Sequence, residues 1–302
     1  MYDKMNFGIF PYNMHSMARA VKKKPNGAIE FDVSEIALDK LTKFAITLGY
    51  NLFELNVGVE YMHPGTCDKY VIKELKRLKE ENKLRYTIHL PFLGLEPASI
   101  NKHSRKAAVN SHVEMINLTK SLEPENYVLH SSGSIAPLFL NTGKQFGIKN
   151  HSLKELTEAA KSTVGEILDK TKIPSKSIAI ENITYPFEST LEIVKENSCS
   201  LCVDTGHFLA GFSGKHDLLE VIKENLPEIA EIHLHDCYIN DKSNRPVDHQ
   251  ALGTGLLDPK FLEFLKNIQF SKPIMLEMTL EQVKQSEIWL KKNYPSIKTK
   301  QD

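Results

Sequence analysis

The residues with the clearest chemical potential are Asp204 and His207, which stand three positions apart directly after a short apolar run. That run, with the β-branched Val203, predicts a buried strand, and Thr205-Gly206 predicts the turn that ends it. A carboxylate at a strand end and an imidazole just beyond it can converge on one point, where they would bind a divalent metal ion. An Asp in this position can equally cap the next helix, so the pair alone does not define a site.

Other metal-binding residue types lie near the ends of further apolar runs. In chain order these residues are His89, His130, Glu181, Asp204 with His207, His233 with His235, and Glu277. Buried carboxylates such as Glu181 and Glu277 are costly unless they pair with a cation or bind a metal, and neither has a Lys or Arg close by in sequence. Together these residues predict a divalent-metal site.

The segment 245–255 adds two more ligand-type groups, Asp248 and His249, on a predicted loop. Its glycines, Gly253 and Gly255, allow the backbone to approach a ligand closely. The alternative interpretation of this segment is a turn before the helix that starts at Asp258-Pro259. Among these groups we expect Gly253 and Gly255 to contact the substrate.

Positions two apart on a strand share a face, so His233 and His235 point the same way. Only one of them needs to bind a metal. The other could support the ligand or face the substrate, and we expect His235, together with Asn182 beside Glu181, to be substrate-binding.

Strand and helix patterns alternate along the chain and position these residues. Strands are predicted at 6–10, 52–55, 86–90, 127–130, 177–183, 199–204, 229–237 and 274–278, and helices after Ser34 and at 68–82, 104–122, 152–170, 188–197, 217–225, 259–267 and 281–293. Eight such units without a linker predict an α/β fold, a single (β/α)8 TIM barrel over residues 1–295 with a polar tail at 296–302. A Gly-rich nucleotide fingerprint is missing, which disfavours an open sheet. Chemistry in such a barrel lies at the carboxyl ends of the strands, where the candidate residues stand.

Composition narrows the classes of partner. Lys and Arg total 38 and Asp and Glu total 38, so no overall basic charge favours nucleic acid. The basic run Lys22–Lys24 is expected to be a solvated loop, and Cys199 and Cys202 are expected to be core residues, because positions three apart on a strand face opposite sides. No apolar run is long enough to span a bilayer and no signal-peptide pattern opens the chain, so we expect a cytoplasmic protein with no membrane partner.

Several short motifs carry a family resemblance. They are Asp204-Thr205-Gly206-His207 followed by Ala210-Gly211-Phe212, then His233-Leu234-His235-Asp236, His249 with Gly253-x-Gly255, His89-Leu90-Pro91-Phe92 and His130-Ser131-Ser132-Gly133. The chain resembles the xylose isomerase-like TIM-barrel superfamily, which includes sugar isomerases and epimerases and the endonuclease IV-type apurinic endonucleases (AP endonuclease family 2). The endonuclease branch is the most similar in pattern. Gly206 stands where that branch has Cys, and Asp248 directly precedes His249 where the family's Asp precedes its His by two.

The resemblance implies roles for these residues. In the endonuclease branch three zinc ions are bound, and the matching motifs imply that Glu181 bridges two of them. The implied sets are His89 and His130 with Glu181 for one ion, Asp204, His233 and Glu277 with Glu181 for the second, and His207, Asp248 and His249 for the third.

Two enzyme classes follow from this set. The first is a phosphoester hydrolase in which clustered zinc ions neutralise phosphate oxygens and lower the pKa of water, acting on a small phosphodiester such as a cobamide nucleotide loop, or on abasic DNA. The alternative is a sugar or sugar-phosphate isomerase or epimerase that uses one Mn, Co or Mg ion, with Glu181 and Glu277 as acid/base groups. The number of ligands favours the hydrolase, and a metal-binding protein without catalysis is a third possibility.

Overall fold

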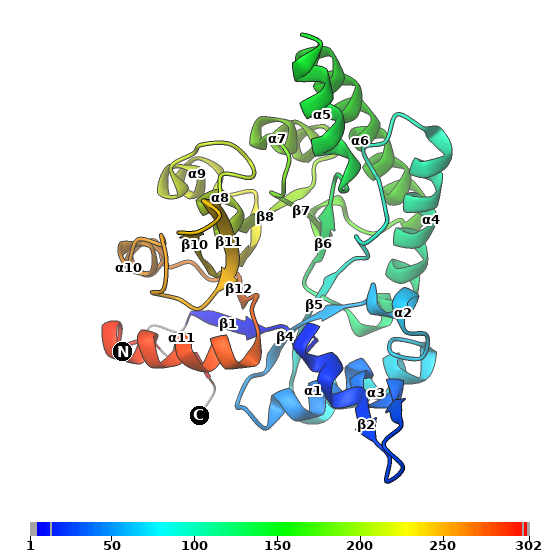
Figure 1. Ribbon diagram of the computed structural model, residues 1–302, viewed down its shortest axis with the longest axis vertical. Helices are drawn as coiled ribbons and strands as arrows, with labels where there is room; N and C mark the ends of the chain where they lie inside the picture. Colours follow the sequence, from blue (N-terminus) through cyan, green and yellow to red (C-terminus); the bar gives the residue numbers. More distant parts are fainter. Residues whose placement is uncertain (1–4, 13, 298, 301–302) are drawn as a thin grey trace.

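The computed structural model describes residues 5–12, 14–297 and 299–300, and eight parallel strands in this part close into a barrel (Figure 1). Around the barrel the strands are ordered β1, β12, β9, β8, β7, β6, β5 and β4. Their bounds are β1 Asn6–Ile9, β4 Leu52–Asn56, β5 Arg85–His89, β6 Tyr127–His130, β7 Ile178–Glu181, β8 Ser200–Asp204, β9 Ile229–His233 and β12 Pro273–Leu276. The predicted single (β/α)8 barrel is confirmed.

Helices surround the barrel and connect its strands (Figure 1). The outer helices are α1 Leu38–Ile46, α3 Lys69–Asn82, α4 Lys102–Thr119, α6 Lys149–Thr171, α7 Phe187–Glu196, α9 Leu218–Asn225, α10 Lys260–Asn267 and α11 Leu280–Asn293. Side chains cap several of them: Asp68 and Asp217 accept the first free amides of α3 and α9, and Thr279 with Gln282 forms a capping box on α11. No helix of the described residues is both long and apolar enough to cross a membrane.

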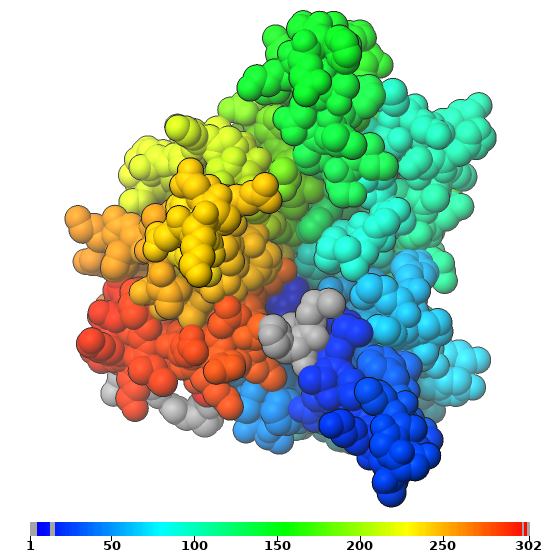
Figure 2. Space-filling view, viewed as in Figure 1, coloured from blue at the N-terminus to red at the C-terminus, as the bar shows by residue number. Residues whose placement is uncertain are grey.

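Further elements lie outside this frame. They are the helices α2 Val59–Met62, α5 Ile135–Gln145 and α8 Thr205–Leu209, the 3-10 turns Met14–Ala20, Val33–Ile36, Lys120–Leu122 and Ser175–Ser177, and the strands β2 Val21–Lys23, β3 Ile29–Phe31, β10 Asp236–Asn240 and β11 Arg245–Gln250. α5 projects from one end of the molecule beside α6 (Figures 1 and 2).

Two antiparallel hairpins differ from the sequence-based expectations. The segment expected to be an irregular loop contains the paired strands β2 and β3. Ion pairs join Lys22 to Asp32 and Lys24 to Glu30 in this segment. The strand expected at 229–237 ends at His233 instead, and the chain continues as β10, which pairs with β11. This second hairpin carries Asp248 and His249.

Alternate residues of the strands fill the barrel interior. Leu52 and Met275 pack with Phe10, and Val128, Ala179 and Cys202 form a second small apolar cluster. All four cysteines are free and buried, as expected for Cys199 and Cys202. In the predicted polar tail, Ile297 is buried against the main core, while residues 298, 301 and 302 lie outside the described part. The interior positions nearest the carboxyl ends of the strands hold polar residues, and these form the site.

Candidate metal centre

The strand-end residues singled out in the sequence meet at one end of the barrel. His89, His130, Glu181, Asp204 and His233 are the last residues of their strands, and Glu277 directly follows β12. The register places them side by side, with His130 opposite Glu181 and Asp204 opposite His233 on neighbouring strands. The closed barrel therefore brings together residues from six different strands.

The central cluster consists of Glu181, Asp204, His233 and Glu277. Each offers one ligand atom, and these atoms all lie within 4.8 Å of one another. The Nδ1 atom of His233 is 2.8 Å from Glu277 Oε2, 3.6 Å from Glu181 Oε1 and 3.8 Å from Asp204 Oδ2. This set could hold a single divalent cation.

Two observations show that these residues fit a metal ion. Among the described residues, His233 Nδ1 and Glu277 Oε2 are buried and lie 2.8 Å apart, yet neither atom makes a hydrogen bond of good geometry. The carboxylates of Glu181, Asp204 and Glu277 form ion pairs with histidines, and none with Lys or Arg in the described part of the chain. Carboxylate oxygens with imidazole nitrogens suit a divalent cation, which would offset the buried negative charge.

A second cluster joins His89, His130 and Glu181. His89 Nδ1 donates to the Leu90 carbonyl oxygen at 3.0 Å, so its Nε2 is free to face Glu181 Oε2 at 3.5 Å. His130 Nε2 is 2.9 Å from the same carboxylate oxygen. The ligand atoms of this group also lie within 4.8 Å of one another, as the family resemblance implies.

A third cluster joins His207, Asp248 and His249. His207 Nδ1 donates to the Asn182 carbonyl oxygen at 2.8 Å, and its Nε2 faces Asp248 Oδ2 at 3.7 Å. His249 Nδ1 lies 3.3 Å from Asp248 Oδ2. His249 lies near the end of β11 and has a φ of 52°, in the left-handed region. The adjacent spacing of Asp248 and His249 thus still brings this group together.

The charged groups of the site depend on one another. Burial alone would raise the pKa of Glu181, but the imidazoles of His130 and His233 outweigh it and hold that pKa well below its usual value. His233 and His249 lower the pKa of Glu277 in the same way. Burial opposes the charge on His233, yet the anionic groups around it raise its pKa well above normal. The apo site therefore offsets its carboxylates with imidazolium groups.

His235 is buried and uses its polar atoms inside the protein. Its Nε2 lies 2.8 Å from Asp204 Oδ2, its Nδ1 accepts the His249 amide at 2.9 Å, and its ring stacks on the His249 ring with centroids 4.2 Å apart. A Cβ atom at Gly206 would lie 2.0 Å from the His235 ring. His235 therefore orients Asp204 and His249, and these contacts give no support to the substrate contact expected for it.

Asn182, Gly253 and Gly255 also have internal roles. Asn182 Oδ1 accepts the Asp204 amide at 2.7 Å, and its Nδ2 donates to the Asp204 carbonyl oxygen. A Cβ atom at Gly253 would lie 2.0 Å from the Trp289 indole nitrogen, and one at Gly255 would lie 2.0 Å from the Cys237 carbonyl oxygen. The close approach expected of the two glycines is thus made to the protein itself, and contact of Asn182, Gly253 and Gly255 with a substrate stays a prediction.

Asp236 is a functional residue that sequence reasoning missed. Its carboxylate is fully buried and accepts the amides of Cys237, Gly253, Gly255 and Leu257 at 2.8–3.0 Å. It thereby fixes the segment that follows His249. The signal available was an acidic residue at the end of His233-Leu234-His235-Asp236.

Glu54 and Glu231 were also missed, and both are buried in the barrel interior below the central cluster. Glu54 Oε2 lies 3.1 Å from His233 Nε2, and Glu231 Oε1 accepts the Thr87 hydroxyl at 3.2 Å. Burial raises the pKa of both carboxyls, further for Glu231. The only signal in the sequence was an acidic residue within an apolar run.

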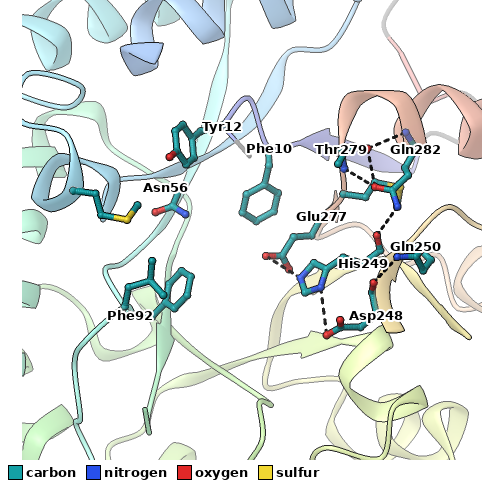
Figure 3. A pocket seen from close by; sticks show the side chains of 13 residues that line it. Phe10, Tyr12, Asn56, Phe92, Asp248, His249, Gln250, Glu277, Thr279 and Gln282 are labelled. Atoms are coloured by element: carbon teal, nitrogen blue, oxygen red, sulfur yellow. Dashed lines mark hydrogen bonds and ion pairs between the residues drawn. The ribbon is translucent and has the colours of Figure 1, made fainter. Parts of the chain in front are cut away.

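A cavity of about 390 Å³ opens beside Asp248, His249 and Glu277 (Figure 3). Its opposite wall includes Phe10, Tyr12, Asn56 and Phe92, and the described residues that line it include no Lys or Arg. Figure 2 shows a hollow at the centre of this face. The volume suits a small-molecule ligand. Aromatic and amide residues after strands carry no distinctive pattern, so this wall could not be predicted from the sequence.

Two basic groups of segments outside the barrel, one on β2 and one on α4, form ion pairs with carboxylates. Lys22 Nζ lies 2.6 Å from Asp32 Oδ2, and Lys106 Nζ lies 2.8 Å from Glu166 Oε1. These pairs reduce the positive charge that either segment could offer to a phosphate backbone.

Comparisons with known proteins agree with this architecture. The family model described as xylose isomerase-like TIM barrel matches residues 43–293. An uncharacterised protein of Methanocaldococcus jannaschii is 27% identical over 232 residues, which cover 73% of this chain and 71% of that protein. The crystal structure of a D-tagatose 3-epimerase-like protein matches with a TM-score of 0.66 and 23% sequence identity, and the match covers 96% of this chain and 97% of that protein's chain. The structure of an L-ribulose 3-epimerase matches with a TM-score of 0.62 and 15% identity, and the match covers 96% of this chain and 86% of that protein's chain.

Proposed function

Because the chain belongs to the xylose isomerase-like TIM-barrel family, we propose that it is a divalent-metal-dependent epimerase or isomerase of a small sugar. The observation that carries this proposal is the pair of carboxylates, Glu181 and Glu277, within the central cluster. They stand on β7 and after β12, and β8 and β9 with Asp204 and His233 lie between those strands. The two carboxylates can thus reach a bound substrate from different sides.

The residues support proton transfer at a carbon next to a carbonyl group. One carboxylate removes the proton from that carbon, and the electron pair of the broken C–H bond moves toward the carbonyl oxygen. The other residue, as a protonated carboxyl group, then delivers a proton. Delivery to the opposite face of the same carbon restores the carbonyl group and gives an epimer, whereas delivery to the former carbonyl carbon, with transfer of the neighbouring hydroxyl proton to the former carbonyl oxygen, gives an isomer. A divalent cation held by Glu181, Asp204, His233 and Glu277 would supply Lewis-acid polarisation of the carbonyl.

The cavity supports an uncharged substrate. No Lys or Arg lines it among the described residues, so a phosphate monoester would have no cationic side chain to pair with there. Tyr12 is 4% exposed and lines the cavity, and its hydroxyl has no hydrogen-bond partner within the described part of the chain. A sugar hydroxyl would satisfy it, while Phe10 and Phe92 can pack on the apolar face of a sugar ring or chain. The likeness to epimerases of D-tagatose type and L-ribulose supports the same substrate class.

The test is solvent exchange at carbon. The purified protein, loaded with Mn²⁺ or Co²⁺, is incubated in D₂O with a panel of free ketoses and followed by NMR. We expect deuterium to enter at the carbon next to the carbonyl group and an epimer or isomer to accumulate. Glu181→Gln and Glu277→Gln should each lower turnover by about 10³-fold, since each removes one acid/base group. Metal content of both variants is measured alongside, and no exchange with any sugar tested would overturn the proposal.

A second candidate, the phosphoester hydrolase, is favoured by the two additional ligand clusters. The groups of His89, His130 and Glu181 and of His207, Asp248 and His249 would allow three ions per chain. Elemental analysis separates the candidates: two or three zinc ions per chain support the hydrolase, and a single Mn, Co or Mg ion excludes it. Hydrolysis of bis(p-nitrophenyl) phosphate provides the matching activity test.

The single substitution His130→Ala distinguishes the epimerase or isomerase from the phosphoester hydrolase. In an epimerase or isomerase it removes one hydrogen bond to Glu181 Oε2, which should cost about 1.5 kcal/mol, or about tenfold in turnover. In a hydrolase it removes a metal ligand and should abolish activity. His216→Ala, whose histidine lies outside the three clusters, is the control. Full phosphodiesterase activity in His130→Ala would refute the assignment of His130 as a ligand.

A further inference from the structure

The barrel interior below the metal centre contains two carboxyl groups where apolar side chains are the usual filling. Glu54 on β4 and Glu231 on β9 are both 0% exposed. Each lies two residues before a residue of the site layer, so alternation along the strands places both on the inner face, one layer deeper. Burying two carboxyl groups without Lys or Arg is costly. A specific interaction must offset that cost.

Glu54 contacts a candidate metal ligand, His233, and the neighbouring carboxyl group of Glu231. Its Oε2 lies 3.1 Å from His233 Nε2, while the opposite ring nitrogen, Nδ1, faces Glu277, Glu181 and Asp204. Glu54 Oε2 accepts the hydrogen on Nε2 and so keeps that hydrogen on the side of the ring away from the cluster. A cation bound in the cluster would replace the proton on Nδ1 and meet the lone pair of that atom.

Glu231 lies farther from the ring. Its Oε1 is 3.8 Å from His233 Nε2, beyond hydrogen-bond distance, and it accepts the Thr87 hydroxyl instead. Thr87 lies opposite Glu54 in the register of β4 and β5. Because Glu54 bonds to the His233 ring and Glu231 does not, substitution of Glu231 is the control for substitution of Glu54.

We propose that Glu54 is a positioning residue of the metal centre, which holds His233 in the ring orientation and tautomer that bind a divalent cation through Nδ1. The inference rests on the metal centre of the proposed function, and it does not depend on the substrate or the reaction. Partners of this kind for metal-binding histidines typically change metal affinity by about 10- to 100-fold when they are removed.

The test measures metal binding by the apo protein directly, by isothermal titration with Mn²⁺ and with Co²⁺. Glu54→Ala should weaken binding about 10- to 100-fold. Glu54→Gln retains an oxygen that accepts from Nε2 and should recover most of that loss. Glu231→Gln, whose side chain does not bond to the ring, should remain within about threefold of the parent protein. Thermal unfolding of each apo variant confirms that it is folded.

A second readout reports the geometry of the site. The visible absorption spectrum of the Co²⁺-loaded protein reflects ligand number and arrangement, so it should change in Glu54→Ala and be preserved in Glu231→Gln. If Glu54→Ala does not fold, Glu54→Gln and Glu231→Gln are compared by the same spectrum and titration. Only Glu54→Gln alters the partner of His233 Nε2, so it should show the larger change, and equal results would overturn the positioning role.

The outcomes separate the two proposals. Unchanged affinity and an unchanged Co²⁺ spectrum in folded Glu54→Ala would overturn the positioning role while leaving the metal centre intact. Equal losses in Glu54→Ala and Glu231→Gln would also overturn it, because they would point to a general effect of the interior. Failure of the parent protein to bind any divalent cation would overturn the metal centre and this inference together.

Discussion

At the scale of single residues, Gly206 shows how one missing side chain shapes the site. It stands where the endonuclease branch has Cys, and the His235 ring occupies the space that a Cβ atom would need. His235 in turn contacts Asp204 and the backbone of His249. The glycine and the histidine therefore form one unit.

Gly206→Ala should destabilise the protein and disturb the site. The added methyl group would lie 2.0 Å from the His235 ring, and overpacking of this kind costs about 1–3 kcal/mol. Urea unfolding of the apo protein measures the loss. Gly165→Ala in α6 is the matched control, since its Cβ would meet only the Asn197 side chain at 3.3 Å and alanine favours the helix. Equal stability of Gly206→Ala and the parent protein would contradict this account.

At the scale of elements, the strand-end residues were predictable because their chemistry and their periodicity agree. His89, Glu181 and Asp204 each end an apolar run, and parallel strands with helical connections can only bring such ends to one edge. The β10–β11 hairpin was not predictable in the same way. Its strands are short and half-exposed, and the continuous run 229–237 concealed the point where β9 ends.

The internal roles of polar residues were the least visible in the sequence. Asn182, His235 and the two loop glycines are residue types that bind substrates in other proteins, and only their three-dimensional neighbours reveal what they contact here. Glu54 was not singled out from the sequence because it stands within an apolar strand, where a buried carboxylate is not expected. Periodicity reports which face a residue occupies, and it does not report which partner it meets across a closed barrel.

Asp236 should be essential to the segment that carries His249. Asp236→Asn replaces one acceptor oxygen by an NH₂ group, so amides of Gly253 and Gly255 or of Cys237 and Leu257 lose their partner. Loss of hydrogen bonds to a buried charge should cost about 3 kcal/mol, measured by urea unfolding. Asp258→Asn, which alters an exposed carboxylate before α10, should change stability by less than about 0.5 kcal/mol. Similar behaviour of the two variants would show that the four contacts are not important.

The packing of α4 should make stability depend on pH. His112 on α4 is 1% exposed, its Nε2 donates to the Pro91 carbonyl oxygen, and burial lowers its pKa from 6.5 to about 4. Between these pH values the unfolded chain binds a proton at this histidine and the folded chain does not. The stability that depends on neutral His112 is therefore complete above pH 6.5 and is lost as the pH falls toward 4. The loss should reach about 3 kcal/mol.

Urea unfolding at pH 7 and pH 4.5 tests this dependence. His112→Gln keeps a donor for Pro91 and cannot titrate, so its stability should fall less on acidification than that of the parent protein. His103→Gln, which changes an exposed histidine on the same helix, should follow the parent protein. Parallel losses in the His112 variant and the parent would show that His112 does not contribute.

At the scale of the whole molecule, charge is balanced overall and segregated locally. Lys and Arg equal Asp and Glu in number, yet Glu181, Asp204, Asp248 and Glu277 meet at one end of the barrel. None of the described residues that line the cavity is a Lys or an Arg. Such a surface attracts small cations and repels polyanions. The arrangement therefore favours a metal ion with a small neutral substrate over a nucleic acid.

Removal of a bound metal should lower the stability of the barrel, because the ligands of the central cluster come from four neighbouring strands, β7, β8, β9 and β12. A cation that binds only the folded state, at about 1,000 times its dissociation constant, stabilises the protein by about 4 kcal/mol. For a chain of this size we expect the melting temperature to be about 10 °C higher with Mn²⁺, Co²⁺ or Zn²⁺ than with EDTA. Asp204→Asn should lose most of that difference, because its carboxylate belongs to the central cluster. Glu166→Gln, which changes a carboxylate on the outer helix α6, should retain it. Equal melting temperatures with EDTA and with every cation would mean that the carboxylates of the barrel mouth are balanced by their histidines alone.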